Sequence, residues 1–548
     1  MLGGNTSSEI RVHACGADHS GGRPHAREGG IMEELRLEDA VRNPQRSNSM
    51  WDLVLEERVR GEAFAQLLVN TGMMGAAVND KGCLGAITCA RPWTEEELIV
   101  EGDMFVDCSG DGTLGFEAGA DFSMGREGPG EFNEPDAEGP DNKTMGCSLM
   151  WIAEDVGHPV PFKPPSWARE FKSEEDLPHR GHGSLEHGHW WVEWGGELDM
   201  IKDQDRIRQE LLACLMGVWD HLKNHGEHEA ENWVLRWFGV LPAKRESRRL
   251  LGPHILNERD LLEMRLFEDR VAHGGWTIDT HPPAGIYDPG PPSSNWYTDD
   301  VYSIPLRSLY SRNVHNLMVA GRCASCTHMA MASTRVAATG AAMGQAAGTA
   351  AAMCVERGCL PGELSGQDIA ELQQQLLRDD HFVVDLPADD PDDLARNATV
   401  SATSEELGRE AAQVLSGVTR HRHGSEHQWA SAPSEKLPQS LELRWAAPQS
   451  ISRVQIIFDT GFVRPLTLTH SDGFNARIIR GPQPETVRDY TIEVESKGSW
   501  APVAEVTDNH QRRRVHEFEA RQAKAVRVTC QATNGTEQAR IFEVRAYE

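Results

Sequence analysis

Two patterns of apolar and polar residues divide the chain near residue 390. Before that point, apolar residues recur at helical spacing over 40–68, 207–225 and 368–379. Short apolar runs at 84–90, 98–108 and 189–195 are typical of strands. After that point, apolar and polar residues alternate in SLELRWA, SRVQIIFDT, DYTIEVES, KAVRVTCQA and IFEVRAYE, which predicts antiparallel strands. We therefore expect an α/β region followed by an all-β region.

The segment between the two regions has the composition of a linker. It reads VVDLPADDPDDLARNA, so it is acidic and contains proline. Domain boundaries commonly fall in such segments, where few contacts cross. We expect two independently folding units that separate near residues 380–395.

The stretch NLMVAGRCASCTHMAMASTRVAATGAAMGQAAG, at 316–348, has the pattern of a strand, a turn and a long helix. Ser333 or Thr334 would be the N-cap of that helix, whose free N–H groups suit an anionic or electron-rich ligand. Three glycines share one face of the helix, which predicts close packing against its backbone: Gly340, Gly344 and Gly348.

Composition argues against membranes and nucleic acid as partners. The chain has 54 basic and 84 acidic residues, a net charge of −30 that repels phosphate and anionic lipid. The uncharged run at 336–354 consists mainly of Ala, Gly and Thr, so we expect a buried helix and no membrane span. The 11 cysteines are scattered, which favours a reducing compartment. No signal peptide is visible in MLGGNTSSEIR, and a cytoplasmic location is the default expectation.

Two groups of potential metal ligands have unconvincing spacing. Cys323 and Cys326 form a C-x-x-C pair without a second pair at zinc spacing, although His328 could add a third ligand. A redox dithiol is an alternative, and we favour buried or half-buried thiols. Four histidines in HRGHGSLEHGHWW fit a glycine-rich loop as easily as a ligand set: His179, His182, His187 and His189. We therefore predict no metal site.

Several stretches resemble one family in order and spacing. They are LGGNTSSEIRVH, REGGIMEELRLE, FVDCSGDGTLGFEAGADFSMGRE, KRESRRLLG and IPLRSLYSRNVHNLMVAGR, followed by STRV and MGQAAGTAA. Together they are similar to bacterial FAD-dependent oxidoreductases of the glutathione-reductase-like superfamily, over roughly residues 1–360. The resemblance implies an α/β fold with an FAD-binding Rossmann-like core, a mixed α+β substrate domain, and FAD as cofactor.

The resemblance begins after the point where the family has its G-x-G-x-x-G unit for the FAD pyrophosphate. The motif that spans Gly110 to Gly115 follows the strand MFVDC, but Asp111 inside the turn would repel phosphate. In the family, this stretch is a later turn that approaches the cofactor from the opposite side. We therefore expect a chain truncated at its N-terminus, for which FAD retention is an open question.

The resemblance also implies domain boundaries. The FAD-binding domain would comprise 1–146 and 311–365, the substrate domain 147–310, and the helix with its acidic linker 366–391. Residues 392–548 resemble discoidin-like (coagulation-factor type C) modules through ATVSATSEE, HQWASAP, SLELRW and ARIFEVRAY. Such modules are jelly-roll-like β-sandwiches that often bind glycans. A sandwich that only packs on the core is an equal alternative.

Site residues follow from the same likeness. Oxidation of an alcohol carbon needs a base for the hydroxyl proton, a role that suits His328 or, second, His13. Arg11 and Arg27 could orient an oxygen-rich substrate or stabilise anionic flavin. The resemblance places the following residues near FAD: Gly3, Gly4, Asn5, Ser7, Ser8, Gly110, Asp111, Gly321, Arg322, Thr334, Arg335, Val336 and Gly344.

The expected function is hydride transfer from a sugar or another polyhydroxylated small molecule to FAD. The alternative is a truncated flavoprotein scaffold that holds no cofactor and binds glycans through its C-terminal sandwich.

Overall fold

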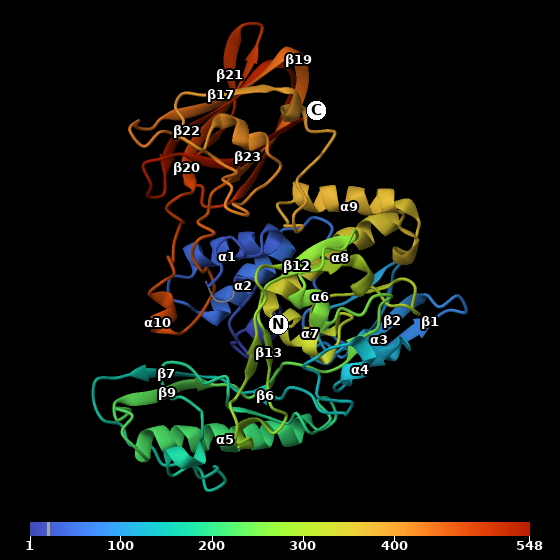
Figure 1. Ribbon diagram of the computed structural model, residues 1–548, viewed down its shortest axis with the longest axis vertical. Helices are drawn as coiled ribbons and strands as arrows, with labels where there is room; N and C mark the ends of the chain where they lie inside the picture. The colour runs from blue at the N-terminus through green and yellow to red at the C-terminus, as the bar shows by residue number, and fades with distance from the viewer. Residues whose placement is uncertain (19–21) are drawn as a thin grey trace. The chain divides into compact units, whose positions relative to one another are not determined.

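The computed structural model describes residues 1–18 and 22–548, which form two compact units (Figure 1). The first unit contains residues 1–18, 45–369 and 467–477. The second contains residues 22–44, 370–466 and 478–548. Each unit therefore includes a segment that is distant in sequence from the rest of it. The domain boundaries expected from the sequence place neither 22–44 in the second unit nor 467–477 in the first.

The helix expected over 40–68 is two helices, α1 (Gly30–Arg42) in the second unit and α2 (Asn48–Arg60) in the first. Pro44 lies between them, where a residue without an amide hydrogen disfavours continuation of a helix. The Ser47 side chain then caps α2 by accepting a hydrogen bond from the Met50 amide. An antiparallel meander follows, made of β1 (Gly72–Val78), β2 (Leu84–Arg91) and β3 (Glu96–Glu101).

The centre of the first unit is a parallel pair of short buried strands, β4 (Phe105–Asp107) and β16 (Leu317–Val319). The long helix α8 (Ala337–Arg357) contacts both strands. In residues 1–18 and 22–548, these are the only two named strands that pair in parallel, so the expected Rossmann-like sheet is reduced to this pair. The turn after β4 leads into α3 (Thr113–Glu117).

The part predicted as the substrate domain is built on α5 (Gln204–Asn224). Ile207, Leu211, Leu215 and Trp219 recur every four residues on one face of this helix and are at most 1% exposed. Short antiparallel strand pairs surround it, and the stretch expected as a strand at 189–195 contributes only β8. Before this part lie β5 (Phe122–Ser123) and α4 (Pro129–Phe132). Its other elements are β6 (Cys147–Ser148), β7 (Trp151–Asp155), β8 (Glu193–Trp194), β9 (Trp233–Phe238), β10 (Ala243–Lys244), β11 (Arg249–Leu250), α6 (Glu258–Leu262), β12 (Arg270–Gly274), β13 (Ile278–Thr280), β14 (Ser294–Trp296) and β15 (Tyr302–Pro305).

The stretch at 316–348 folds as a strand, a turn and two helices, which corrects the predicted helix start. Helix α7 (His328–Thr334) begins early, because the Thr327 hydroxyl accepts a hydrogen bond from the Ala330 amide at 3.2 Å. Thr334 is therefore the last residue of α7, and Val336 caps α8 without a side-chain bond. None of the described helices is both long and apolar enough to cross a membrane.

Close packing is found at one of the three glycines on the α8 face. A Cβ at Gly340 would lie 3.3 Å from the Cα of Gly321. At Gly344 and Gly348, no described atom comes within 4 Å of the corresponding position. The neighbouring turn therefore packs only on the first turn of α8, and the expectation that Gly344 lets the cofactor come close to the helix stays a prediction.

The second unit is an antiparallel β-sandwich whose strands pair in the order β18-β23-β19-β22-β20-β21, with β17 beside β19. Tyr490, Ile492 and Val494 alternate into its core and are fully buried, as period-two patterning predicts. The segments SLELRWA and SRVQIIFDT form one long strand with register shifts. The elements are α9 (Gly366–Arg378, from Ala370 on), β17 (Thr399–Ala402), β18 (Trp429–Ala430), β19 (Gln439–Phe458), β20 (Val487–Ser496), β21 (Ser499–Val506), β22 (Arg513–Thr533) and β23 (Arg540–Tyr547), whereas α10 (Asp472–Asn475) belongs to the first unit.

The acidic segment before the sandwich is an integral part of the second unit, contrary to its prediction as a linker with few contacts. Just before this segment, Asp380 pairs with Arg512 at 2.7 Å, and both side chains are buried. Within it, Asp385 pairs with Arg422 at 3.1 Å. Asp390 accepts a hydrogen bond from Tyr547 at 3.0 Å. Asp393 accepts one from the Ala546 amide at 2.9 Å. Acidic residues of this segment thus accept hydrogen bonds from residues of the sandwich, which attaches the segment to it.

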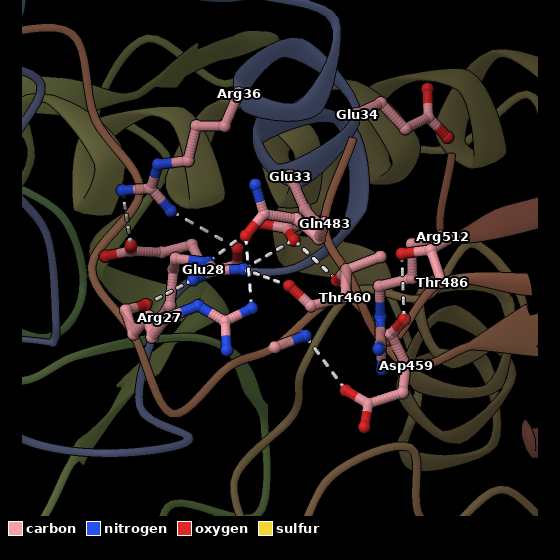
Figure 2. Close-up of polar contacts among 12 residues, drawn as sticks. Arg27, Glu28, Glu33, Glu34, Arg36, Asp459, Thr460, Gln483, Thr486 and Arg512 are labelled. Carbon is pink, nitrogen blue, oxygen red and sulfur yellow. Dashed lines mark hydrogen bonds and ion pairs between the residues drawn. The ribbon is translucent and has the colours of Figure 1, made fainter. Parts of the chain in front are cut away.

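Figure 2 shows a second buried charge cluster of the same unit. The Arg27 guanidinium donates to both carboxylate oxygens of Glu33, at 2.8 and 2.7 Å, and each side chain is 1% exposed. The Thr460 hydroxyl donates to Glu33 at 2.8 Å, and Arg27 also donates to the Arg464 carbonyl at 2.6 Å. Arg27 therefore joins the segment 22–44 to the sandwich, which corrects the expectation that it faces substrate or flavin.

Candidate functional site

The segment 244–249 connects several of the predicted site residues in the first unit. The Asn5 side-chain amide donates to the Lys244 carbonyl at 2.9 Å, which attaches the N-terminal turn. The Lys244 ammonium lies 2.5 Å from the Asp111 carboxylate, and the Ser247 hydroxyl donates to that carboxylate at 2.8 Å. Strands β10 and β11 hold the two ends of the segment.

Asp111 occupies a turn with two glycines in the left-handed region, Gly110 at φ 74° and Gly112 at φ 61°. Burial alone would raise the pKa of Asp111, but the charges of Arg322 and Lys244 hold this pKa below its ordinary value. The carboxylate is therefore ionised and neutralised by its neighbours. The repulsion of phosphate expected from this side chain is offset by two cations.

Arg322 follows Gly321, whose φ of 81° also requires glycine-like freedom. One guanidinium nitrogen of Arg322 lies 3.5 Å from Asp111. Another, Nη1, is buried and has no hydrogen-bond partner among residues 1–18 and 22–548. A buried unpaired guanidinium nitrogen needs an acceptor. Flavin carbonyl and phosphate oxygens are such acceptors, so this part of the site fits FAD.

His328 and Glu246 form a buried pair beside that turn. The imidazole Nδ1 lies 2.8 Å from a Glu246 carboxylate oxygen, and the side chains are 8% and 0% exposed. Arg249 pairs with the other carboxylate oxygen of Glu246. Burial alone would raise the pKa of Glu246, but His328 and Arg249 lower it. An ionised carboxylate accepts the Nδ1–H bond, which leaves Nε2 of a neutral His328 with a free electron pair.

A second charged group lies around Arg335. Its guanidinium pairs with Asp279 at 3.0 Å and lies 3.1 Å from Nε2 of His281. The Nδ1 of His281 lies 2.6 Å from Glu193, which also pairs with Arg245 at 3.3 Å. Nε2 of His281 also lies 3.2 Å from Asp279, so neighbouring side chains engage both ring nitrogens. The Nε of Arg335 is buried without a partner among the described residues.

Of the helix start predicted at Thr334, Arg335 and Val336, only Val336 lies at the start of α8, as its N-cap, whereas Thr334 and Arg335 end α7. The Arg335 amide donates to the Met331 carbonyl at 3.1 Å and closes α7. At the start of α8, the Ala338 amide donates to the Cys15 carbonyl at 2.9 Å. The N-terminal segment thus occupies one of the N–H groups that were expected to be free for the flavin.

The N-terminal turn is folded by its own polar groups. Gly3 and Gly4 have φ values of 88° and 52° and lead into a short 3₁₀ helix, Gly4–Thr6. The carbonyl of Ser7 accepts the Arg11 amide at 2.9 Å, and the Ser8 amide donates to Asp52 at 3.1 Å. The roles of these residues near FAD stay predictions. Asn5 alone among them is shown above to contact the segment 244–249.

Arg11 and His13 lie in other surroundings than His328. The Arg11 guanidinium is 4.0 Å above the Trp237 ring and donates to the Ser8 carbonyl. His13 shares a hydrogen bond of 3.0 Å with Thr469. Burial, together with His187 and His470, lowers the pKa of His13 to about 3. Such a histidine is a much weaker base than an unperturbed one.

Cys323 and Cys326 are buried free thiols, as expected. Burial raises the pKa of Cys326 to about 12, and it raises the pKa of Cys323 well above its ordinary value. The Cys323 thiol donates to the Asp107 carbonyl at 3.4 Å. Protonated buried thiols are poor nucleophiles, so these residues serve packing next to β4.

Sequence reasoning missed most of the charged residues that surround His328. The segment KRESRRLLG was used only as a family likeness, yet Glu246, Ser247 and Arg249 are fully buried. Charged residues are rarely buried without partners. The available signal was a run of charges directly before an apolar strand, but the partners that reveal its role are distant in sequence.

Comparison with known proteins identifies the family of the chain. The chain belongs to the FAD dependent oxidoreductase family, which matches residues 1–376. No curated protein matches the chain.

The C-terminal part is similar to solved carbohydrate-binding modules at low identity. The family 32 module of C. perfringens NanJ, solved with galactose, is 22% identical and covers 28% of this chain and 96% of its own, with a TM-score of 0.21. Chitosan-binding module 1 from Paenibacillus sp. IK-5 is 24% identical over 28% of this chain and 98% of its own, with a TM-score of 0.21. The family 32 module of Streptococcus pneumoniae EndoD is 20% identical, and the match covers 28% of this chain and 99% of that module, with a TM-score of 0.22.

Proposed function

We propose that the protein oxidises an alcohol group of a sugar or another polyhydroxylated small molecule. FAD, when bound, supplies the acceptor for the hydride that leaves the alcohol carbon. The observation that carries the proposal is the buried His328–Glu246 pair, because its geometry directs Nδ1 at a carboxylate and leaves Nε2 as the ring nitrogen that can exchange a proton with a substrate. Family membership supports the choice of cofactor.

His328 is the base of this proposal. The Glu246 carboxylate holds the ring by its Nδ1–H, which fixes both the orientation of the imidazole and the tautomer with a lone pair on Nε2. Nε2 takes the proton of the substrate hydroxyl as the carbon becomes a carbonyl. Arg249 keeps Glu246 ionised, so the carboxylate can stabilise the imidazolium that results.

The cofactor would be held by the turn at Gly321 and Arg322 together with the turn at Gly110 and Asp111. Support comes from the unpaired buried nitrogen of Arg322 and from Gly340, where the backbone of α8 approaches Gly321. Arg335, whose Nε is likewise buried and unpaired among the described residues, is a candidate to orient an oxygen of the substrate.

A panel of polyols tests the proposal. The protein is loaded with FAD and mixed without oxygen with hexoses, pentoses and alditols, each beside a deoxy analogue. We expect at least one polyol to bleach the visible flavin band, with a product two hydrogens lighter, because hydride and proton leave the same hydroxyl-bearing carbon. Bleaching by dithionite but by none of the polyols would contradict the proposed substrate class.

A further inference from the structure

Four potential metal ligands meet at the C-terminal end of α5, in a part of the first unit that the proposed oxidation does not use. Glu174 lies on a 3₁₀ turn, and His182 follows it in a loop. His221 is in the last turn of α5, and His228 lies in the loop beyond that helix. One ligand atom from each residue lies within 4.8 Å of all the others.

The separations within the group match the edges of a small coordination polyhedron. Nε2 of His221 and Nε2 of His228 are 3.1 Å apart, and both lie close to the same Glu174 oxygen, at 3.3 and 3.2 Å. Nδ1 of His182 is 3.3 Å from the other Glu174 oxygen. Zinc–nitrogen bonds of about 2.0–2.1 Å in a tetrahedron place neighbouring ligands about 3.3–3.4 Å apart. Glu174, His221 and His228 therefore already have the spacing of zinc ligands, and one ligand atom of His182 lies within 4.8 Å of theirs.

The hydrogen bond behind His221 directs an electron pair into the group. Its Nδ1 lies 3.0 Å from the carbonyl of Phe171, and a carbonyl only accepts, so Nδ1 carries the hydrogen. In the neutral ring, Nε2 then has a lone pair, which points at the nitrogen of His228 and at a Glu174 oxygen. At this distance, either a hydrogen on Nε2 of His228 or a cation between the two nitrogens satisfies that lone pair. A carbonyl behind the distal nitrogen is also the usual support of a metal-bound histidine.

The group is buried on the histidine side and open on the carboxylate side. The side chains of His182, His221 and His228 are 7%, 1% and 12% exposed, whereas that of Glu174 is 64% exposed. Trp191 packs edge-on against His182 with ring centres 5.6 Å apart. The rings are thus held in place by the protein, while an ion can enter from solvent past Glu174.

We propose that Glu174, His182, His221 and His228 bind a zinc ion. Three imidazoles and one carboxylate are ligands that zinc accepts, and four protein ligands are typical of a structural site. The ion would fasten the segment around 171–182 to the end of α5. Of the four histidines clustered at 179–189, only His182 takes part. The proposal departs from the sequence-based expectation of no metal site.

Cobalt serves as the spectroscopic probe, because tetrahedral Co²⁺ absorbs visible light. The full chain is stripped with a chelator, dialysed and titrated with Co²⁺, and Zn²⁺ is then added. We expect a visible Co²⁺ spectrum that saturates at one ion per chain and is abolished by Zn²⁺. Zinc should also raise the unfolding temperature, since the ion binds only the folded site.

Variants separate this site from unspecific binding. Glu174→Gln changes an exposed side chain and leaves the fold intact, and it should weaken Co²⁺ binding about tenfold or more, as His228→Asn should. His225→Asn is the matched control on the same segment, since His225 pairs with Asp220 at 3.3 Å outside the group, and it should bind like the wild type. An absent Co²⁺ spectrum, or equal binding by Glu174→Gln, His228→Asn and His225→Asn, would overturn the proposal and leave a histidine–carboxylate ion pair.

Discussion

Replacement of Arg27 by methionine is expected to lower the free energy of unfolding of the second unit by about 3–5 kcal/mol. The variant leaves Glu33 buried, with only the Thr460 hydroxyl as a described side-chain partner in place of its bidentate cation. An uncompensated buried carboxylate costs far more than the lost contact of an exposed pair. Urea unfolding followed by tryptophan fluorescence and circular dichroism measures the change.

Two further variants distinguish a buried pair from a general charge effect. Arg42→Met removes an arginine of α1, the helix that carries Glu33. Arg42 pairs with Glu38 at the surface, at 3.4 Å, and its loss should change stability by less than about 1 kcal/mol. Adding Glu33→Leu to Arg27→Met should recover much of the loss, because no charge then remains buried. If Arg27→Met and Arg42→Met were equally stable, the segment 22–44 would not be a necessary part of the sandwich unit.

Replacement of His328 by asparagine should slow flavin reduction by substrate about a hundredfold or more while the flavin spectrum is retained. Asparagine keeps a hydrogen bond to Glu246 but cannot take a proton. Glu246→Gln should slow the same step, because the amide no longer fixes the tautomer of the ring or stabilises its charge. Stopped-flow absorbance of the FAD-loaded protein, with a polyol found active in the panel, measures the rate.

The matched control is His254→Asn. His254 also pairs with a carboxylate, Asp260, at 2.8 Å, but it lies outside the group around His328. The His254→Asn variant should therefore reduce flavin at the wild-type rate. If His328→Asn were reduced as fast as the wild type, His328 would not be the base. His13 would be tested next, although its low pKa disfavours it.

Local elements were largely predictable from the sequence, because they rest on short-range periodicity. Apolar residues at helical spacing predicted α5, and the alternation of apolar and polar residues predicted the strands of the sandwich. The start of α7 was missed because three candidate caps lie within eight residues, and only the tertiary bonds of Ser333 to Tyr302 and Trp276 decide against the later ones.

Long-range pairing was not predictable. Arg27 and Thr460 meet across 433 positions of sequence, and no property of either residue alone indicates the other. The same limit explains the histidine group. Proximity in sequence favoured a cluster at 179–189, whereas the fold brings His182 to His221 and His228. A site formed by contacts between residues distant in sequence can be recognised only in the three-dimensional structure.

Residues near the expected cofactor were predictable only through family likeness. It drew attention to Asp111, Arg322 and His328, whose roles near FAD stay predictions and which the segment 244–249 connects through Lys244, Ser247 and Glu246. It gave no role to that segment itself, because charged side chains next to a strand usually face solvent.

Retention of flavin tests the central claim most directly. The protein is incubated with FAD, separated from free FAD by gel filtration, and its visible absorption spectrum is recorded. The site at Arg322 predicts bound-flavin bands in the wild type and in Arg312→Met, whose arginine pairs with Asp121 at the surface. Arg322→Met should retain much less flavin, because the buried donor is lost. A folded but colourless wild-type protein would contradict the assignment of this chain as a working flavin oxidoreductase.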